Sequence, residues 1–473
     1  MRKTKIVCTM GPACDSVDTL REMIRSGMNV ARLNMAHGEL EDHARRIERI
    51  REAAAAENAI VPILLDIKGP EVRIGKLEEA SYMLVAGETL TLTTEEVLGN
   101  GRRIHVNYSE LPLVVKPGNT ILLDDGLIDL EVASVEATEV HCTIVNGGLI
   151  KPRKGVNLPG IRTTLPGVTE RDIRHIHFGI QQNIDIIAPS FVRRAEDILE
   201  IRELLQAHGA GHVQIISKIE NEEGVVNLDS IIAASDGIMV ARGDLGVEIP
   251  VQDVPSMQRD MINKCNVAGK PVIVATHMLD SMQVNPRPSR AEVSDVAGAV
   301  MQGTDAIMLS GETAAGKYPV QSVATMAAIA LKAESQLDYY AGFQERRQLA
   351  STTITEVISQ AVVSSSLELK AKAILTRTES GFTARMVSKY RPQSPVIAIT
   401  SDEKILPLLA LIWGVIPVKG TKTGTTDELL HAAMADAEQT GLLAEGDFVV
   451  ITAGAPVGLS GTTNLIKIEQ YGV

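Results

Sequence analysis

The chain has 473 residues, of which 45% are hydrophobic, and it carries a formal net charge of −13 at pH 7. This length predicts about three domains of roughly 150 residues, each able to bury a core of its own. The acidic balance argues against nucleic acid as a partner, and no apolar stretch approaches the ~18 residues of a membrane span.

Eight short, β-rich apolar runs recur along the first two thirds of the chain, with helical patterns between most of them. The runs cover residues 5–9, 29–34, 61–66, 184–190, 213–220, 238–244, 271–276 and 306–310. Eight alternating β and α units predict an α/β fold, a closed (β/α)₈ TIM barrel. An open doubly wound sheet would alternate similarly but need not stop at eight strands. The first helix is expected to open at Asp15 or Ser16 and to close at Gly27.

The interval between the third and fourth strands is too long for a simple crossover. Its alternating runs predict an inserted all-β domain, with turns at Asp125-Gly126 and Asn146-Gly147. A further α/β region follows the barrel, with strands expected near residues 373–375, 396–400 and 448–452. The expected domains are residues 1–69 with 168–345 for the barrel, 70–167 for the insertion, and 346–473 for the C-terminal α/β domain.

The four cysteines are Cys8, Cys14, Cys142 and Cys265. They lack paired CxxC spacing and nearby metal-ligand histidines, so buried, reduced thiols are expected. The apolar run behind the charged start of the chain is too short for a signal peptide. These features together predict a cytoplasmic location.

Two apolar runs that end abruptly in charge mark the expected active site. Lys218 and Glu220 end one run and Asp244 ends the next, and barrel active sites lie at the carboxyl ends of the strands. An amine beside two carboxylates suits Mg²⁺ with an anionic substrate, because hard cations take oxygen ligands and the amine neutralises phosphate or enolate charge. Structural ion pairing is the alternative interpretation.

Residues 311–318 match a P-loop except at the last position, where Tyr318 stands in place of the Ser or Thr that holds Mg²⁺. Phosphate binding is therefore expected to depend on metal, lysine and arginine. His37 and His43 have no third partner nearby and are expected to make one polar contact each, not to bind metal.

A basic cluster, Lys151, Arg153 and Lys154, ends the predicted insertion. A run of this kind is often only a solvated loop. Its position equally suits phosphate contact from a closing lid, so both interpretations stay open.

The C-terminal region contains three loops rich in hydroxyl groups and glycine, at residues 378–383, 423–426 and 460–463. The first follows a strand and opens a helix, where free backbone N–H groups make an anion site. Ordinary helix caps and turns explain each loop singly, whereas three in one domain favour a second phosphate-binding site. The candidate effector residues are Thr378, Ser380, Gly381 and Thr383.

Residues 213–225, VQIISKIENEEGV, resemble the active-site signature of the pyruvate kinase family. Similar family motifs occur along essentially the whole chain, at residues 32–34, 66–71, 154–160, 239–248, 285–288 and 308–312. Residues 451–458 resemble the bacillus branch, although the sequence ends at Val473 without the additional C-terminal domain of many bacillus enzymes. The resemblance implies a (β/α)₈ barrel, a β-domain inserted after the third strand, a C-terminal effector domain and, usually, a homotetramer.

The resemblance implies transfer of a phosphoryl group from phosphoenolpyruvate to ADP, which gives pyruvate and ATP. It implies that Glu220 and Asp244 bind Mg²⁺ (or Mn²⁺) and that Lys218 stabilises the phosphoryl group in flight. The implied substrate residues are Arg32, Lys218, Gly243, Asp244 and Thr276, and those toward the nucleotide are Asn34, His37, Arg73 and Lys154. Thr276 with Ser310 is expected to organise a water for protonation of the enolate.

Four departures from the family pattern concern the K⁺ site and the floor of the substrate site. Ala36 stands where the family usually has a serine ligand to K⁺, and Ile67 where it has threonine. His277 replaces glutamine, and Pro189 replaces alanine. K⁺ dependence is still expected, because Glu71 occupies the place where an acidic residue accompanies it in this family. The expected K⁺ ligands are the side chains of Asn34 and Asp66 and the backbone carbonyl of Ile67.

Two other functions fit part of the pattern. A Mg²⁺-dependent carbon–carbon lyase or aldolase on a related barrel would handle pyruvate enolate without nucleotide, so ADP-dependent release of pyruvate distinguishes it. A pseudoenzyme would sense sugar phosphate through residues 378–383. The presence of Lys218, Glu220 and Asp244 argues against the pseudoenzyme.

Overall fold

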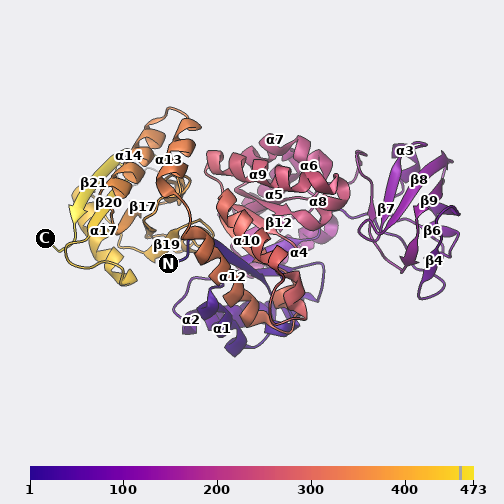
Figure 1. Cartoon of the computed structure of the whole chain (residues 1–473), viewed down its shortest axis with the longest axis horizontal. Coiled ribbons are helices and arrows are strands. Elements are labelled where there is room, and N and C mark those ends of the chain that lie inside the picture. The colour runs from indigo at the N-terminus through magenta and orange to yellow at the C-terminus, as the bar shows by residue number, and fades with distance from the viewer. Residues whose placement is uncertain (457–460, 473) are drawn as a thin grey trace.

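The protein forms three bodies in a row, with the barrel between the inserted domain and the C-terminal domain (Figure 1). This computed structural model describes residues 1–456 and 461–472. The barrel has two clusters of buried apolar side chains, one of which also includes Leu408 and Leu411 of the C-terminal domain. The inserted domain has one cluster, and the C-terminal domain has two of its own. Each body therefore has its own hydrophobic core.

Eight parallel strands close into a barrel, in the order β1-β16-β15-β14-β13-β12-β3-β2, which confirms the predicted fold class. Nearly every residue of these strands is buried, which explains why they read as continuous apolar runs. Their bounds are β1 Lys5–Thr9, β2 Val30–Asn34, β3 Ile63–Ile67, β12 Ile186–Pro189, β13 Gln214–Ile219, β14 Gly237–Ala241, β15 Val272–Ala275 and β16 Ala306–Leu309.

The helices of the barrel surround these strands (Figure 1). Helix α1 (Val17–Ser26) begins after Ser16, whose hydroxyl accepts the Thr19 N–H, and ends at Gly27, so Ser16 rather than Asp15 is the cap. The other helices are α2 Leu40–Ala56, α4 Glu170–Gln181, α5 Ala195–Ala207, α6 Glu222–Val226, α7 Leu228–Ala234, α8 Arg242–Glu248, α9 Val254–Ala268, α10 Arg290–Gln302, α11 Gly311–Ala314 and α12 Pro319–Glu334.

The predicted strand at residues 238–244 was too long. Strand β14 ends at Ala241, and α8 begins at the next residue, so Asp244 lies in the first turn of a helix. A helix of seven residues is too short for its periodicity to be separated from the apolar run before it.

The inserted domain is all-β apart from one short helix, as predicted. A six-stranded sheet, β11-β7-β8-β9-β5-β6, lies beside the pair β10-β4. The elements are β4 Tyr82–Leu84, β5 Thr89–Thr93, β6 Arg103–His105, α3 Leu111–Val114, β7 Thr120–Leu123, β8 Ile128–Val135, β9 Glu139–Asn146, β10 Gly148–Ile150 and β11 Val156–Asn157.

One of the two turns predicted in this domain is present and the other is not. Asp125-Gly126 turns the chain between β7 and β8, with positive φ at both residues. At Asn146-Gly147 the prediction was wrong, because the chain passes from β9 into β10 and changes strand partners. A Cβ on Gly147 would lie 2.2 Å from the Leu84 carbonyl oxygen, so close backbone approach, not a turn, requires this glycine.

The C-terminal domain is a five-stranded sheet, β19-β18-β17-β20-β21, with helices packed on it. The three predicted strands are confirmed as its centre, but both edge strands were missed. Pro417 inside β19 weakens its strand pattern, and β21 is only half-buried. The elements are α13 Tyr339–Gln348, α14 Ile354–Glu368, β17 Ala373–Arg377, α15 Phe382–Ser388, β18 Val396–Thr400, α16 Leu406–Leu409, β19 Val415–Lys419, α17 Thr426–Ala437, β20 Phe448–Ala453 and β21 Leu465–Gln470.

All four cysteines are buried and free, as expected. Burial raises the pKa of the Cys14 thiol to about 11, which keeps it protonated at neutral pH. None of the helices in the described residues combines the length and apolar character needed to cross a membrane.

Candidate active site

A cluster of buried charges lies at the carboxyl ends of β2, β3 and β13. Arg32 Nε lies 2.7 Å from Asp66 Oδ2, and Lys218 Nζ lies 3.1 Å from Asp66 Oδ1. Lys218 also donates to Ser190 Oγ over 2.6 Å and lies 3.2 Å from Glu220 Oε1. The exposed fractions of Arg32, Asp66, Lys218 and Glu220 lie between 1% and 8%. The fold therefore concentrates two cations and two carboxylates in one water-poor site.

The environment keeps Lys218 charged. Burial opposes its ammonium form, but Asp66 and Glu220 outweigh burial and raise its pKa above the ordinary value. Burial likewise opposes ionisation of Asp66, yet Arg32 and Lys218 hold the pKa of this carboxyl below its usual range. A fixed positive charge is thus available to an anionic substrate without any proton uptake.

Glu220 and Asp244 together have more negative charge than their surroundings balance. Burial raises the pKa of Glu220 to about 7; Lys218 opposes the rise, and Asp244 and Asp66 add to it. Burial also raises the pKa of Asp244. Two carboxylates that resist ionisation without a partner fit a divalent cation with oxygen ligands. Within the described ranges no three His, Cys, Asp or Glu side chains form a ready metal cluster, so substrate and water would have to complete the coordination.

Thr276 and Gly243 meet through an unusual backbone conformation. Thr276 and His277 both have positive φ, at 73° and 55°, which non-glycine residues rarely adopt. Arg242 Nη2 donates to the Thr276 carbonyl oxygen over 2.6 Å, and its Nη1 donates to Asp295 Oδ1 over 2.7 Å. A Cβ on residue 243 would lie 2.9 Å from Thr276 Cγ2, so the contact requires glycine. Sequence reasoning missed Arg242, whose only local signal is a charge directly after a buried strand.

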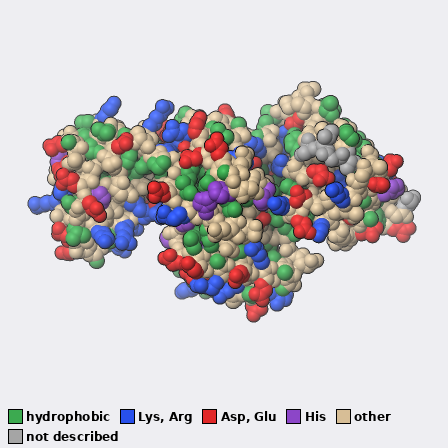
Figure 2. Space-filling view, turned by 180° about the vertical axis from the view of Figure 1, so that it is seen from behind, with side chains coloured by type: hydrophobic (Ala, Val, Ile, Leu, Met, Phe, Trp, Pro, Cys, Tyr) green, Lys and Arg blue, Asp and Glu red, His purple; other side chains and the backbone are tan. Residues whose placement is uncertain are grey.

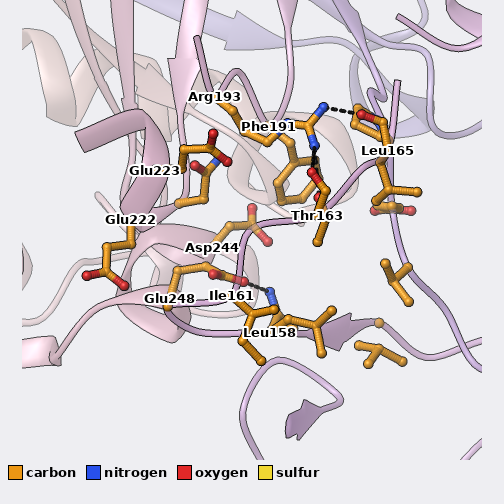
Figure 3. Close-up of a pocket in the computed structure, with 18 of the residues that line it drawn as sticks. Leu158, Ile161, Thr163, Leu165, Phe191, Arg193, Glu222, Glu223, Asp244 and Glu248 are labelled. Atoms are coloured by element: carbon orange, nitrogen blue, oxygen red, sulfur yellow. Dashed lines mark hydrogen bonds between the residues drawn. The ribbon is translucent and has the colours of Figure 1, made fainter. Parts of the chain in front are cut away.

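A cavity of about 500 Å³ lies between the barrel mouth and the inserted domain (Figure 3). Arg73 and Lys154 line it from the inserted side, and Asp244 lines it from the barrel. Lys154 Nζ pairs with Asp124 Oδ1 at 2.6 Å. Two of the four predicted nucleotide residues, Arg73 and Lys154, therefore line the same cavity as Asp244, a candidate metal ligand.

The other two predicted nucleotide residues, Asn34 and His37, are not among the described residues that line this cavity. Asn34 Oδ1 accepts the Ala36 N–H over 3.1 Å. The His37 carbonyl oxygen lies 2.8 Å from His43 Nε2, so His43 makes the single polar contact expected of it.

The predicted K⁺ ligands already have protein partners. Both Asp66 carboxylate oxygens contact Arg32 or Lys218, and the Ile67 carbonyl accepts the Ser190 N–H over 3.1 Å. Glu71 is paired with Lys68 and Arg73, which lowers its pKa although burial opposes this.

The P-loop-like segment at residues 311–318 does not form a phosphate loop. Its first residues form α11, and the Glu312 carboxylate accepts the backbone N–H groups of Ser310, over 2.7 Å, and Leu279, over 3.0 Å. A carboxylate at this position repels phosphate, which agrees with the prediction that this segment is not a P-loop.

The candidate effector loops lie close together at one end of the C-terminal sheet. Thr378 and Thr383 are buried, and Thr383 Oγ1 lies 3.0 Å from Thr463 Oγ1, while Gly381 precedes α15 with φ of 77°. Ser460 of the third predicted loop lies outside the described residues.

The loop at residues 423–426 is an ordinary helix cap. Thr425 caps α17, and the Glu428 carboxylate accepts the Gly424 N–H over 3.0 Å. A carboxylate already fills the positions that an anion would need, so this loop does not support the effector site.

Family models described as the barrel domain and the alpha/beta domain of pyruvate kinase match residues 1–323 and 356–469. The chain belongs to the pyruvate kinase family. It is 56% identical to a pyruvate kinase of Geobacillus stearothermophilus, covering 99% of this chain and 80% of that protein. A Bacillus licheniformis pyruvate kinase is 52% identical, covering 100% of this chain and 81% of that protein.

The fold agrees with this membership. The crystal structure of a pyruvate kinase from Cryptosporidium parvum superposes with a TM-score of 0.94 at 41% identity, covering 99% of this chain and 96% of that one. The chain is thus a phosphotransferase of the glycolytic type that converts phosphoenolpyruvate and ADP to pyruvate and ATP.

Proposed function

We propose that the charge cluster at the barrel mouth performs this phosphoryl transfer, with Lys218 as the central catalytic residue. The observation that carries the proposal is the position of the Lys218 ammonium between Asp66 and Glu220, at 3.1 and 3.2 Å. Asp244, whose pKa the Lys218 charge lowers against the effect of burial, lines the cavity that contains Arg73 and Lys154. A loose phosphoryl transition state spreads charge over its oxygens, so fixed cations lower its energy without a protein nucleophile.

The remaining predicted residues have the following proposed roles, and contacts in the structure support those in substrate binding. Arg32, aligned by Asp66, and Thr276, held by Arg242, bind the substrate together with Lys218, Asp244 and the Gly243 backbone. Glu220 and Asp244 hold Mg²⁺ or Mn²⁺, which when bound supplies positive charge to the phosphoryl oxygens. Thr276 and Ser310 orient a water toward the enolate carbon. Arg73 and Lys154 contact the nucleotide from the cavity, whereas Asn34 and His37, which are not among its lining residues, stay predicted nucleotide contacts from the family resemblance alone.

A coupled assay with phosphoenolpyruvate, ADP and Mg²⁺, with and without K⁺, tests this proposal. ADP-dependent formation of pyruvate is expected, with ATP formed in equal amount. Pyruvate release that is independent of ADP would favour the lyase alternative, because a lyase needs no nucleotide.

Potassium dependence is expected, with a weakened site. Ala36 provides no hydroxyl ligand, and the remaining candidates, Asn34, Asp66 and the Ile67 carbonyl, already have protein partners. Ala36→Ser is expected to lower the K⁺ concentration for half-maximal rate about fivefold, or ~1 kcal/mol, the net value of one polar contact. Rates measured against K⁺ at constant ionic strength provide the test. A titration of the variant that superimposes on the wild type, or activity indifferent to K⁺, would contradict this site.

A phosphorylated metabolite is expected to activate the enzyme through Thr378, Ser380, Gly381 and Thr383. The Glu379 charge opposes a bisphosphate, so a sugar monophosphate or nucleoside monophosphate is the expected class. Saturation curves for phosphoenolpyruvate with ribose 5-phosphate, AMP and fructose 1,6-bisphosphate test this, and identical curves with all three would count against it.

We also propose a cytoplasmic homotetramer. No strand of the described residues pairs with the outer edge of β21. Ile354, Val357 and Ile468 are exposed apolar side chains on the nearby α14 and β21. An open strand edge beside apolar side chains favours pairing with another copy. Analytical ultracentrifugation would report the assembly state.

A further inference from the structure

The inserted domain contacts the barrel helix α8 through a hydrogen bond that the catalytic roles leave unexplained. Asn157, the last residue of β11, donates from Nδ2 to Glu248 Oε1, at the last residue of α8, over 2.8 Å. Burial raises the pKa of this carboxyl, and the bond from Asn157 and the Leu158 N–H oppose the rise. Figure 3 shows Glu248 making this bond on the same side of the cavity as Asp244. One barrel carboxylate thus binds the end of an inserted strand.

A second contact joins the same two parts. The turn between β7 and β8 lies against α8, since a Cβ placed on Gly126 would be 3.4 Å from Val247 Cγ1. Val247 precedes Glu248, so the inserted domain contacts two consecutive residues at the carboxyl-terminal end of α8.

The opposite end of α8 contains the active-site residues. Gly243 and Asp244 lie in its first turn, and Gly243 packs against Thr276. A helix of this length spans only about 10 Å and moves as one piece, because its backbone hydrogen bonds lie within it. A displacement at Glu248 is therefore expected to move Gly243 and Asp244 as well.

We propose that Glu248 is a positioning residue that fixes the inserted domain on α8, so that domain closure and the placement of Gly243 and Asp244 occur together. The inference rests on the proposed function, because it needs Arg73 and Lys154 of the inserted domain to face the nucleotide. Loss of the bond would free Arg73 and Lys154, which face the nucleotide, from their fixed position relative to α8 and Asp244. The largest expected effect is therefore weaker binding of ADP.

Kinetics of four variants test the bond. Glu248→Ala is expected to raise KM for ADP about tenfold and to lower kcat, with a smaller change in KM for phosphoenolpyruvate. Asn157→Asp places two carboxylates together, so it is expected to raise KM for ADP by a similar factor. The double variant Glu248→Gln with Asn157→Asp exchanges donor and acceptor and is expected to restore KM for ADP to within about threefold of wild type. Asp253→Asn is the matched control, because this exposed carboxylate follows α8 closely in sequence.

A distance measurement separates positioning from a purely local effect. All four native thiols are buried, so spin labels attach selectively to cysteines introduced at Leu113 in the inserted domain and Leu199 in the barrel, both exposed. Glu248→Ala is expected to broaden the distribution of distances between these labels. The exchanged double variant is expected to narrow it again.

The inference would be overturned if Glu248→Ala had the KM for ADP of the wild type and an unchanged distribution of distances between the labels. Kinetic loss in both single variants that the exchange fails to restore would also overturn it, because that result places the role of Glu248 inside the barrel. Failure of the unmodified enzyme to form pyruvate from phosphoenolpyruvate and ADP would overturn the proposed function instead.

Discussion

Lys218→Met is expected to lower kcat by about 10²–10³-fold or more while leaving the fold intact. The Lys218 ammonium is the buried cation between Asp66 and Glu220, and its charge is needed most as charge develops on the transferred phosphoryl group. Asp66 also pairs with Arg32, at 2.7 Å, so one ion pair of the cluster is expected to survive in the variant. Steady-state kinetics and circular dichroism spectra of the variant and the wild type are compared.

The matched control is Lys332→Met, which removes the same charge from an exposed position on α12. It is expected to keep the activity of the wild type. A Lys218→Met enzyme with more than about a tenth of wild-type activity would contradict the assigned role, since a tenfold loss is only ~1.4 kcal/mol of transition-state stabilisation.

Glu220→Gln is expected to raise the half-saturating Mg²⁺ concentration at pH 8 by at least about tenfold, because one of two carboxylate ligands is lost. The wild-type enzyme should also show a pH dependence that the variant lacks. The pKa of Glu220 without metal is about 7, so a proton competes with the cation as the pH falls below 7. The apparent Mg²⁺ affinity of the wild type is then expected to fall up to about tenfold for each further pH unit.

Asp244→Asn tests the origin of this pH dependence, although the variant also removes a proposed Mg²⁺ ligand and therefore binds Mg²⁺ more weakly at every pH. The Asp244 charge contributes to the raised pKa of Glu220, so its removal is expected to move the midpoint to lower pH. Activity measured against Mg²⁺ between pH 6 and pH 8 would show this. An apparent Mg²⁺ affinity of the wild type that is independent of pH over this range would contradict the assignment of Glu220 as a ligand.

The fold class was predictable because its signals are local. A strand buried on both faces is apolar along its whole length, so the barrel strands were visible as short runs, and their charged ends marked Lys218 and Glu220. The errors arose where local signals were weak or ambiguous. Pro417 obscured an edge strand, α8 was too short to show helical periodicity, and Gly147 suggested a turn where the backbone makes a close approach.

The order of residues along the chain is enough to predict which chemical groups are present and which strand ends they occupy. Their combination into a site depends on the folded structure, because the contacts that build the site join residues far apart in the chain. Lys218 meets Asp66, which lies 152 positions away, and Asn157 meets Glu248 across two domains. The charge state of Glu220 also depends on the folded structure. Its pKa is set by burial and by its neighbours in space, and neither can be read from the residues next to it in the sequence.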